Sequence, residues 1–214
     1  TMAPIAVLAP EVADQIAAGE VVERPASVVK ELVENALDAG AGSIEITVEN
    51  AGRTLIRVRD DGGGIPREEL TLAFRRFATS KIGRAHDLEA VATYGFRGEA
   101  LASIAAVSEA EIASRPRGAP EGARCLSRHG VPGAVEPWGG PEGTVVSVRS
   151  LFANTPARLR FLKTDATERH HIARVATALA LGGSEAGITL AMDGRILLDT
   201  RGRPGLRARA AYLL

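Results

Sequence analysis

Residues 25–40 constrain the fold more than any other stretch, because they place apolar and polar side chains on opposite faces of one predicted helix. Pro25 suits the first turn of a helix and Gly40 suits a left-handed stop, so backbone chemistry marks both ends. The apolar face holds Val28, Val29, Leu32, Val33, Ala36 and Leu37, and the polar face holds Glu31, Glu34, Asn35 and Asp38. Such a helix can pack on a core and still present a site, although a solvated outer face is the simpler interpretation of the helix alone.

A half-buried hairpin is predicted directly after this helix. Apolar residues alternate over residues 43–50 and again over residues 54–59, and Ala51-Gly52 supplies the turn. The second strand ends in Asp60-Asp61-Gly62-Gly63-Gly64, so a carboxylate is followed by three glycines whose backbone a ligand can approach closely. Residues 95–98 are also rich in glycine and precede a predicted helix, an arrangement that offers N–H groups to an anion such as phosphate. Each glycine cluster taken alone is more typical of an ordinary turn.

The rest of the pattern predicts a sheet with helices packed on one face. Helices are predicted over residues 66–77, 99–106 and 168–181, and strands over residues 109–114, 143–150, 188–192 and 195–198. Asp193-Gly194 between the last two strands is a strong hairpin signal, whereas residues 115–122 and 139–143 are typical of surface loops. Strands that return through tight turns favour an α/β (α+β) two-layer sandwich with a mixed, mostly antiparallel sheet.

Composition fits a globular chain and excludes several kinds of site. The 214 residues are 45% hydrophobic and 24% charged, which indicates one substantial domain and at most two. The single cysteine, Cys125, rules out an internal disulfide and fits a reducing, cytoplasmic setting. No long apolar run, secretory leader, Walker loop or dinucleotide-binding glycine pattern is present in the sequence. The four histidines lack the spacing of a metal motif: His86, His129, His170 and His171.

The order of the motifs carries a resemblance to a known family. Glu-x-x-x-Asn on a helix, Asp-x-Gly-x-Gly after a strand and Gly-x-x-Gly before another helix resemble the GHKL (Bergerat-type) ATP-binding fold. Type II DNA topoisomerases, heat-shock chaperone ATPases, histidine kinases and the mismatch-repair MutL family share that fold. Residues 15–25, 78–81, 95–101 and 154–158 are more specifically similar to MutL and its homologues. These segments run from the N-terminus to Arg158, so the resemblance covers most of the chain.

The resemblance implies ATP and Mg²⁺ as ligands and a role for each matched residue. Glu31 would position and deprotonate the attacking water, and the side-chain oxygen of Asn35 would ligate magnesium. Asp60 would accept a hydrogen bond from the adenine amino group, which favours ATP over GTP because a carbonyl there would face another acceptor. Thr144 would complete the adenine end of the site. The full set of implied ATP-binding residues is Asn35, Ala39, Asp60, Gly62, Gly64, Ile65, Thr79, Ser80, Lys81, Gly95, Phe96, Arg97, Gly98, Glu99, Ala100, Leu101 and Thr144.

Two departures from the family pattern bear on activity. The family usually reads Asp-Asn-Gly where this chain has Asp60-Asp61-Gly62, so Asp61 weakens binding if it points inward and changes little if it points outward. In the family a lysine from a following domain reaches the γ-phosphate, and no residue here matches it, so slow hydrolysis is expected. We accordingly predict an arm and first helix over residues 1–24, the ATP-binding domain over residues 25–204, and over residues 205–214 the start of a following domain that is otherwise absent.

The resemblance further implies a nucleotide-driven switch. ATP would order the lid around residues 95–101 together with the arm over residues 5–20, and two copies would then associate as a homodimer. Mismatch-recognition and downstream repair proteins would be the protein partners, no membrane is expected as one, and the setting would be cytoplasmic, or nucleoid-associated in a bacterium.

Charge allows only weak, non-specific DNA binding. Lys and Arg number 26 and Asp and Glu also 26, so the formal charge is zero. A local basic face in the second half of the chain would touch phosphates, and a solvated surface is an equally good interpretation. The residues concerned are Arg149, Arg158, Arg160, Lys163, Arg169, Arg174, Arg201, Arg203, Arg207 and Arg209.

Three interpretations stay open from the sequence. The first is a mismatch-repair ATPase with Glu31 as catalytic base, and the second is a nucleotide-gated binding module without significant hydrolysis. The third is a topoisomerase-like or kinase-like relative, which the extended match at both ends disfavours.

Overall fold

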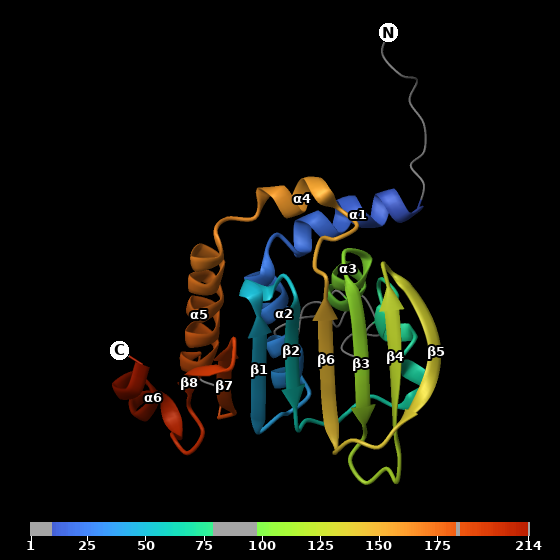
Figure 1. The fold of residues 1–214 in the computed structure, drawn as a ribbon. Helices are drawn as coiled ribbons and strands as arrows, with labels where there is room; N and C mark the ends of the chain where they lie inside the picture. Colours follow the sequence, from blue (N-terminus) through green and yellow to red (C-terminus); the bar gives the residue numbers. More distant parts are fainter. Residues whose placement is uncertain (1–9, 79–97, 183–184, 214) are drawn as a thin grey trace, which may run out of the picture.

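Eight strands form one mixed sheet in the order β5-β4-β3-β6-β2-β1-β7-β8 (Figure 1). The computed structural model describes residues 10–78, 98–182 and 185–213. The strands are β1 (Ser43–Glu49), β2 (Leu55–Asp60), β3 (Glu109–Arg115), β4 (Gly122–Arg128), β5 (Val131–Trp138), β6 (Gly143–Arg149), β7 (Gly187–Met192) and β8 (Arg195–Asp199). Neighbours pair antiparallel except β1 and β7, which are parallel. The mixed, mostly antiparallel sheet expected from the sequence is confirmed.

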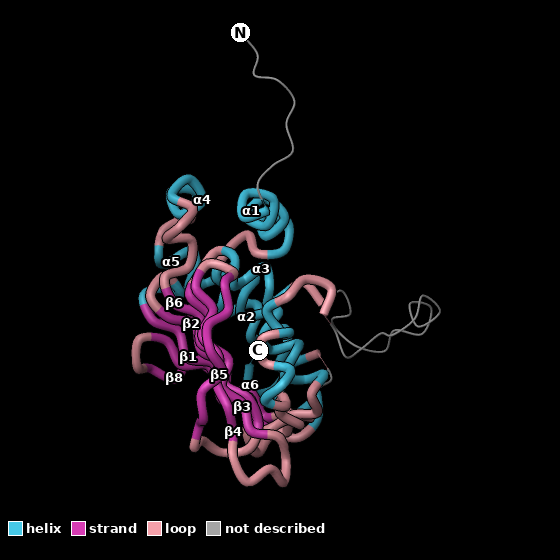
Figure 2. The backbone as a smooth tube through the Cα atoms, turned by 90° about the vertical axis from the view of Figure 1, so that its right-hand side faces the viewer, coloured by secondary structure: helices cyan, strands magenta, loops and turns pink. Residues whose placement is uncertain are grey.

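Helices line one side of this sheet, as the view along its edge shows (Figure 2). The helices are α1 (Pro10–Val21), α2 (Pro25–Asp38), α3 (Ala100–Ala106), α4 (Pro156–Phe161), α5 (Asp165–Leu181) and α6 (Gly205–Leu213). Helix α2 packs against β2 and α5, α1 packs against α3, and α6 packs against α5. Among the described residues, no helix combines the length and apolar character needed to cross a membrane.

The apolar face of α2 supplies the centre of the core, as its sequence predicts. Val28, Val29 and Val33 are fully buried. They pack in one cluster with inward-facing strand residues such as Ile44 and Ile56. Burying side chains of this size contributes about 1.5–3 kcal/mol each, so this helix is held mainly by its apolar face. The expectation that Glu34 shares the outer face is wrong, because Glu34 is buried and accepts a hydrogen bond from Lys30 at 3.1 Å.

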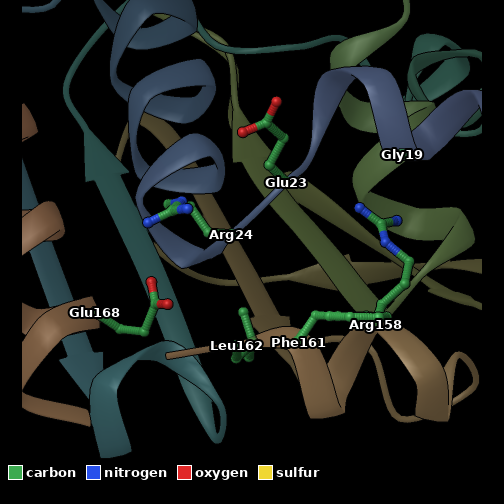
Figure 3. A pocket seen from close by; sticks show the side chains of 7 residues that line it. All are labelled: Gly19, Glu23, Arg24, Arg158, Phe161, Leu162 and Glu168. Carbon is green, nitrogen blue, oxygen red and sulfur yellow. The ribbon is translucent and has the colours of Figure 1, made fainter. Parts of the chain in front are cut away.

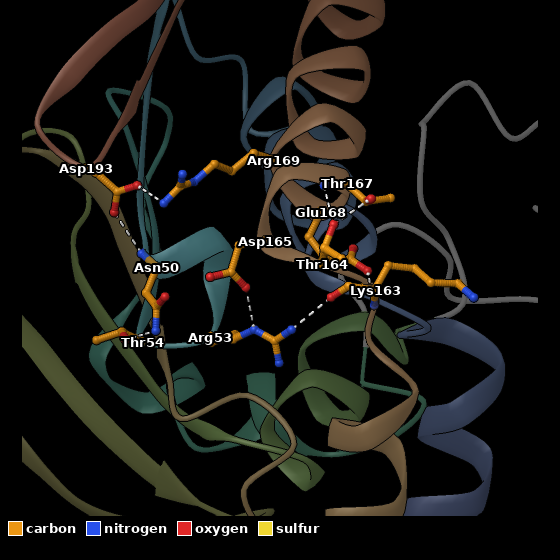
Figure 4. Close-up of polar contacts among 10 residues, drawn as sticks. All are labelled: Asn50, Arg53, Thr54, Lys163, Thr164, Asp165, Thr167, Glu168, Arg169 and Asp193. Atoms are coloured by element: carbon orange, nitrogen blue, oxygen red, sulfur yellow. Dashed lines mark hydrogen bonds and ion pairs between the residues drawn. The ribbon is translucent and has the colours of Figure 1, made fainter.

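A polar network ties the β1–β2 turn to the start of α5 (Figure 4). Arg53 pairs with Asp165 at 3.1 Å and donates to the carbonyl oxygen of Lys163 at 3.0 Å. On the other side of the turn, Asp193 accepts from the Asn50 backbone N–H at 2.8 Å and pairs with Arg169 at 2.7 Å. These contacts join segments far apart in the sequence and fix the start of α5 beside the β1–β2 turn.

Two expectations about secondary structure need correction. Residues 66–77 do not form a long helix but two 3₁₀ turns, Arg67–Glu69 and Leu72–Phe74, which suffice to bury Leu70 and Phe74. Strands β4 and β5 were not predicted. The buried positions of β4 carry small residues in place of the large apolar ones that mark a strand, and β5 is an edge strand that contains two prolines, Pro132 and Pro137.

The basic residues of the second half do not form one continuous free face. Arg209 is buried and donates to the carbonyl oxygens of Ala180 and Ala186 at 3.0 and 2.9 Å, so it holds α6 against the end of α5. Arg169 and Arg201 are engaged with Asp193 and Asp199. Exposed basic side chains remain at Arg149, Arg160, Lys163, Arg174 and Arg207.

Candidate functional site

Three polar side chains lie in one row on the buried face of the sheet. Thr144 on β6 is directly opposite Asp60 on β2 and also opposite Ser114 on β3. Paired residues on neighbouring strands point to the same face, so the three side chains are neighbours. Asp60 is 8% exposed, Thr144 7% and Ser114 1%, whereas Ile44 and Ala123 at the two ends of the row are apolar. A polar row inside an apolar face marks this end of the sheet as the candidate site.

Asp60 is the ionisable residue of this row, and its pKa is shifted. Burial raises the pKa of Asp60 to about 6, while hydrogen bonds from the backbone N–H groups of Gly62 and Thr144 lower it and the charge of Asp61 raises it slightly further. The Gly62 N–H donates to Oδ1 of Asp60 at 2.8 Å. A desolvated carboxylate of this kind is typical of a functional site, because a ligand donor would relieve the cost of its burial.

Asp61 points away from this carboxylate. Its Oδ1 atom accepts from the backbone N–H groups of Gly42 and Ser43 at 2.7 and 2.8 Å, and its side chain is exposed. Of the two orientations left open by the sequence, the structure therefore shows the outward one. Asp61 holds the start of β1 and leaves the acceptor at Asp60 unobstructed.

The glycines after Asp60 are required by close packing. A Cβ atom on Gly62 would lie 2.9 Å from the Ala39 carbonyl oxygen, and one on Gly64 would lie 2.7 Å from the Arg115 carbonyl oxygen. Gly64 also has φ +77°, which other residues rarely adopt. The Gly63 N–H donates to the Ala39 carbonyl oxygen at 2.9 Å, so the loop is fastened to the end of α2.

Helix α2 carries the other predicted residues along one line. Since an α-helix rises about 1.5 Å per residue, Asn35 lies about 6 Å and Glu31 about 12 Å along the axis from Ala39. The Glu31 side chain is 24% exposed, and its Oε1 atom lies 3.6 Å from Nζ of Lys30. The predicted residues of α2 are therefore spread along the helix axis, with Ala39 at the end that contacts the glycine loop and Glu31 farthest from it.

Lys30 links the two glutamates of this helix. Its Nζ atom also lies 3.1 Å from Oε2 of Glu34. Burial lowers the pKa of Lys30, but the hydrogen bond to Glu34 and the charges of both glutamates raise it to a net value above its ordinary one. The ammonium group is therefore held charged next to the predicted catalytic base.

The structure brings together only part of the predicted set. Thr79, Ser80, Lys81, Gly95, Phe96 and Arg97 lie outside the described residues. Gly98, with φ +62°, and Glu99 lead directly into α3, which holds Ala100 and Leu101. Glu99 lies 3.9 Å from the Arg76 guanidinium. The described residues thus include the polar row, the glycine loop and α2, and of the segment over residues 95–101 only the part that leads into α3.

Sequence reasoning missed Ser114. Its hydroxyl accepts from the Ile65 backbone N–H at 2.8 Å and lies 3.0 Å from Oγ1 of Thr144. Its place at the end of a strand whose other buried residues are apolar was the available signal, but only the strand register shows that it is opposite Thr144.

A separate hollow lies away from this row (Figure 3). It has a volume of about 230 Å³ and is lined by Gly19, Glu23, Arg24, Arg158, Phe161, Leu162 and Glu168. Arg158 spans it, donating to the Val22 carbonyl oxygen with its guanidinium 4.4 Å from the centre of the Phe152 ring. None of the predicted site residues lines this hollow, and its arginine fastens α4 to the end of α1. We therefore place the site at the polar row and not here.

The described residues hold no cluster of three or more His, Cys, Asp or Glu side chains able to bind a metal. His170 and His171 have ring centres 6.3 Å apart and planes inclined by 58°. A hydrated Mg²⁺ bound mainly by nucleotide phosphates needs only one or two protein oxygens, so Asn35 alone fits such an ion.

Comparisons with known proteins agree with this geometry. The family described as "Histidine kinase-, DNA gyrase B-, and HSP90-like ATPase" matches residues 23–132. "DNA mismatch repair protein MutL" of Haemophilus influenzae is 52% identical over 199 residues, covering 92% of this chain and 32% of the relative. The Anaeromyxobacter dehalogenans protein of the same name is 49% identical over 213 residues, covering 100% of this chain and 35% of the relative. The chain thus spans about a third of the length of these relatives.

A solved structure gives the same result in three dimensions. The structure described as "Aquifex aeolicus MutL ATPase domain complexed with ADP" has a TM-score of 0.72 and 35% identity, covering 90% of this chain and 69% of that one. The chain belongs to the family of histidine kinase-, DNA gyrase B- and HSP90-like ATPases. Within that family its sequence and fold match the N-terminal ATPase region of MutL. A topoisomerase-like or kinase-like relative is not supported.

The buried carboxylate predicts a pH dependence of stability in the ligand-free protein. Because the folded-state pKa of Asp60 is about 6 and the model-compound value is 3.8, the folded state holds its proton over a range where the unfolded state has lost it. This contribution to stability is fully present below pH 4 and is lost as pH rises through 6, an effect on the order of 3 kcal/mol. Urea unfolding of wild type and Asp60→Asn at pH 4, 5.5 and 7 should show the variant gaining stability relative to wild type as pH rises. An equal difference at all three values would contradict it.

Proposed function

We propose that this chain binds ATP with Mg²⁺, places the adenine against Asp60 and uses Glu31 to promote hydrolysis. The observation that carries the proposal is the buried row that ends in Asp60, joined to α2 through the contact between Gly63 and Ala39. The Aquifex aeolicus domain with the same fold was solved with ADP, which supports a nucleotide as the ligand.

The site would select adenine through hydrogen-bond acceptors of the protein. Asp60 would accept from the adenine amino group, relieving the burial of its carboxylate. Gly62 and Gly64 would let the backbone lie close to the ring, and Ile65 and Thr144 would complete this end. A guanine carbonyl in the same place would face the carboxylate as a second acceptor, which disfavours GTP.

The phosphate side would be built on α2 and on the segment that leads to α3. Asn35 would contribute the protein oxygen to Mg²⁺, which neutralises phosphate charge and clamps the triphosphate. Thr79, Ser80, Lys81 and residues 95–101 would contact the phosphates. Glu31 would orient a water molecule and accept its proton as the water attacks the γ-phosphate.

The repair role belongs to the same proposal. The longer relatives are DNA mismatch repair proteins, so we propose that this chain is the nucleotide-driven part of such a protein. Mismatch-recognition and downstream repair proteins would be its partners in the cytoplasm. Weak DNA binding would be confined to exposed basic residues such as Arg149, Arg160 and Arg174.

Changing Glu31 separates hydrolysis from binding. Glu31→Ala should lower single-turnover hydrolysis of Mg-ATP, measured with protein in excess, by about a hundredfold or more, because a positioned base is lost. Binding of a non-hydrolysable analogue should stay within about twofold, and Glu69→Ala, which removes an exposed carboxylate, should leave both unchanged. Equal turnover in wild type and Glu31→Ala would instead favour a nucleotide-gated binding module without enzymatic hydrolysis.

Nucleotide should also change the association state. If ATP orders the lid and the N-terminal arm, a non-hydrolysable analogue with Mg²⁺ should raise the dimer fraction measured by sedimentation velocity. ADP should raise it less, because the γ-phosphate is missing. A saturated analogue complex that remains strictly monomeric would count against the switch.

A further inference from the structure

Ser114 is a buried residue whose hydroxyl contacts three residues around the predicted adenine site. It is 1% exposed and is the penultimate residue of β3, directly opposite Thr144 on β6. Its Oγ atom lies 2.8 Å from the Ile65 nitrogen, 2.9 Å from the Gly143 carbonyl oxygen and 3.0 Å from Oγ1 of Thr144. One side chain thus contacts Ile65 after the glycine loop, Gly143 at the start of β6, and Thr144.

The hydrogen-bonding capacity of a serine fixes the direction of these contacts. A hydroxyl has one proton to donate and two lone pairs to accept with. The Gly143 carbonyl oxygen can only accept, so the Ser114 hydroxyl donates its proton to it. The Ile65 N–H can only donate, so it occupies one of the two lone pairs of Ser114 Oγ. The remaining lone pair receives the proton of the Thr144 hydroxyl, and all three contacts are then satisfied.

This arrangement determines what Thr144 presents to a ligand. With its proton committed to Ser114, Oγ1 of Thr144 has only lone pairs left, beside the carboxylate of Asp60 in the same row. Two neighbouring acceptors can share the two protons of one exocyclic amino group, such as that of adenine. They disfavour a 6-oxopurine, whose carbonyl oxygen occupies the place of that amino group.

We propose that Ser114 is a positioning residue that sets the base specificity of the nucleotide site by holding the Thr144 hydroxyl as an acceptor. This inference rests on the proposed nucleotide function and deepens it. Ser114 does not touch the base; it acts through Thr144 and, by fixing Ile65, through the backbone that follows Gly64. Without Ser114, the Thr144 hydroxyl is free to rotate and donate to an oxo group.

The test is a pair of calorimetric titrations with non-hydrolysable triphosphate analogues of adenosine and of inosine, with Mg²⁺. Ser114→Ala should weaken adenosine-analogue binding by about three- to tenfold, the loss of one net hydrogen bond, and inosine-analogue binding by less. The ratio of the two dissociation constants should therefore fall by about threefold or more. Ser127→Ala is the matched control, because Ser127 is equally buried, lies on the neighbouring strand β4 and faces Ala110 instead of the site.

Further variants guard against a purely structural effect. Ser114→Cys keeps nearly the same volume with a much weaker donor and acceptor, so it should shift the ratio in the same direction even if the alanine variant folds poorly. In a Thr144→Val background, Ser114→Ala should leave the ratio unchanged, because the hydroxyl through which it acts is gone.

The outcomes separate this inference from the function on which it rests. Equal weakening of both analogues, or no change in either, in a wild-type protein that binds adenosine nucleotide would overturn the role of Ser114 and leave ATP binding intact. No saturable binding of either analogue by wild type would overturn the proposed function and the inference together.

Discussion

The carboxylate of Asp60, buried at the end of β2, is the feature on which the rest of this site depends. Removing a carboxylate from water is unfavourable unless hydrogen bonds replace its hydration. The chain supplies the Gly62 N–H and the backbone of Thr144, yet burial still keeps the pKa of Asp60 near 6. The free protein is thus preorganised for a donor on a ligand, at some expense of its own stability near neutral pH.

The surrounding fold explains how this one acceptor is given a fixed position. Strand β6 lies between β2 and β3, so sheet register and not local sequence places Thr144 beside Asp60 and Ser114 on the other side of Thr144. The Ala39 carbonyl oxygen then receives the Gly63 N–H and fastens the glycine loop to α2. Through that contact, the helix that carries Glu31 and Asn35 is aligned with the adenine end. A nucleotide spanning the site would connect two elements that the chain already holds in register.

Local patterns allowed much of this to be predicted. The amphipathic period and end signals of α2, the alternation in β1 and β2 and the turn at Asp193-Gly194 are all short-range features, and the structure confirms them. Asp60 was recognisable because glycines follow it. The outward orientation of Asp61 was not predictable, because it depends on the N–H groups of Gly42 and Ser43, which only the fold brings near.

Other features depended on long-range contacts and stayed hidden. Ser114 gains its position opposite Thr144 from strand pairing, and the burial of Glu34 is not visible in the sequence pattern of α2 alone. Strand β4 was missed because its buried residues are small. The predicted divisions at residues 24 and 204 remain predictions, although α1 packs on α3 and α6 packs on α5 as parts of the same described structure.

The most direct test of the account is calorimetric titration of this chain with a non-hydrolysable ATP analogue and Mg²⁺, run in parallel on Asp60→Asn. We expect saturable binding by wild type and a loss of about tenfold or more in the variant, because the amide is uncharged and replaces one of the two carboxylate acceptors with a donor. Binding of equal strength by both proteins would contradict the placement of the adenine against Asp60.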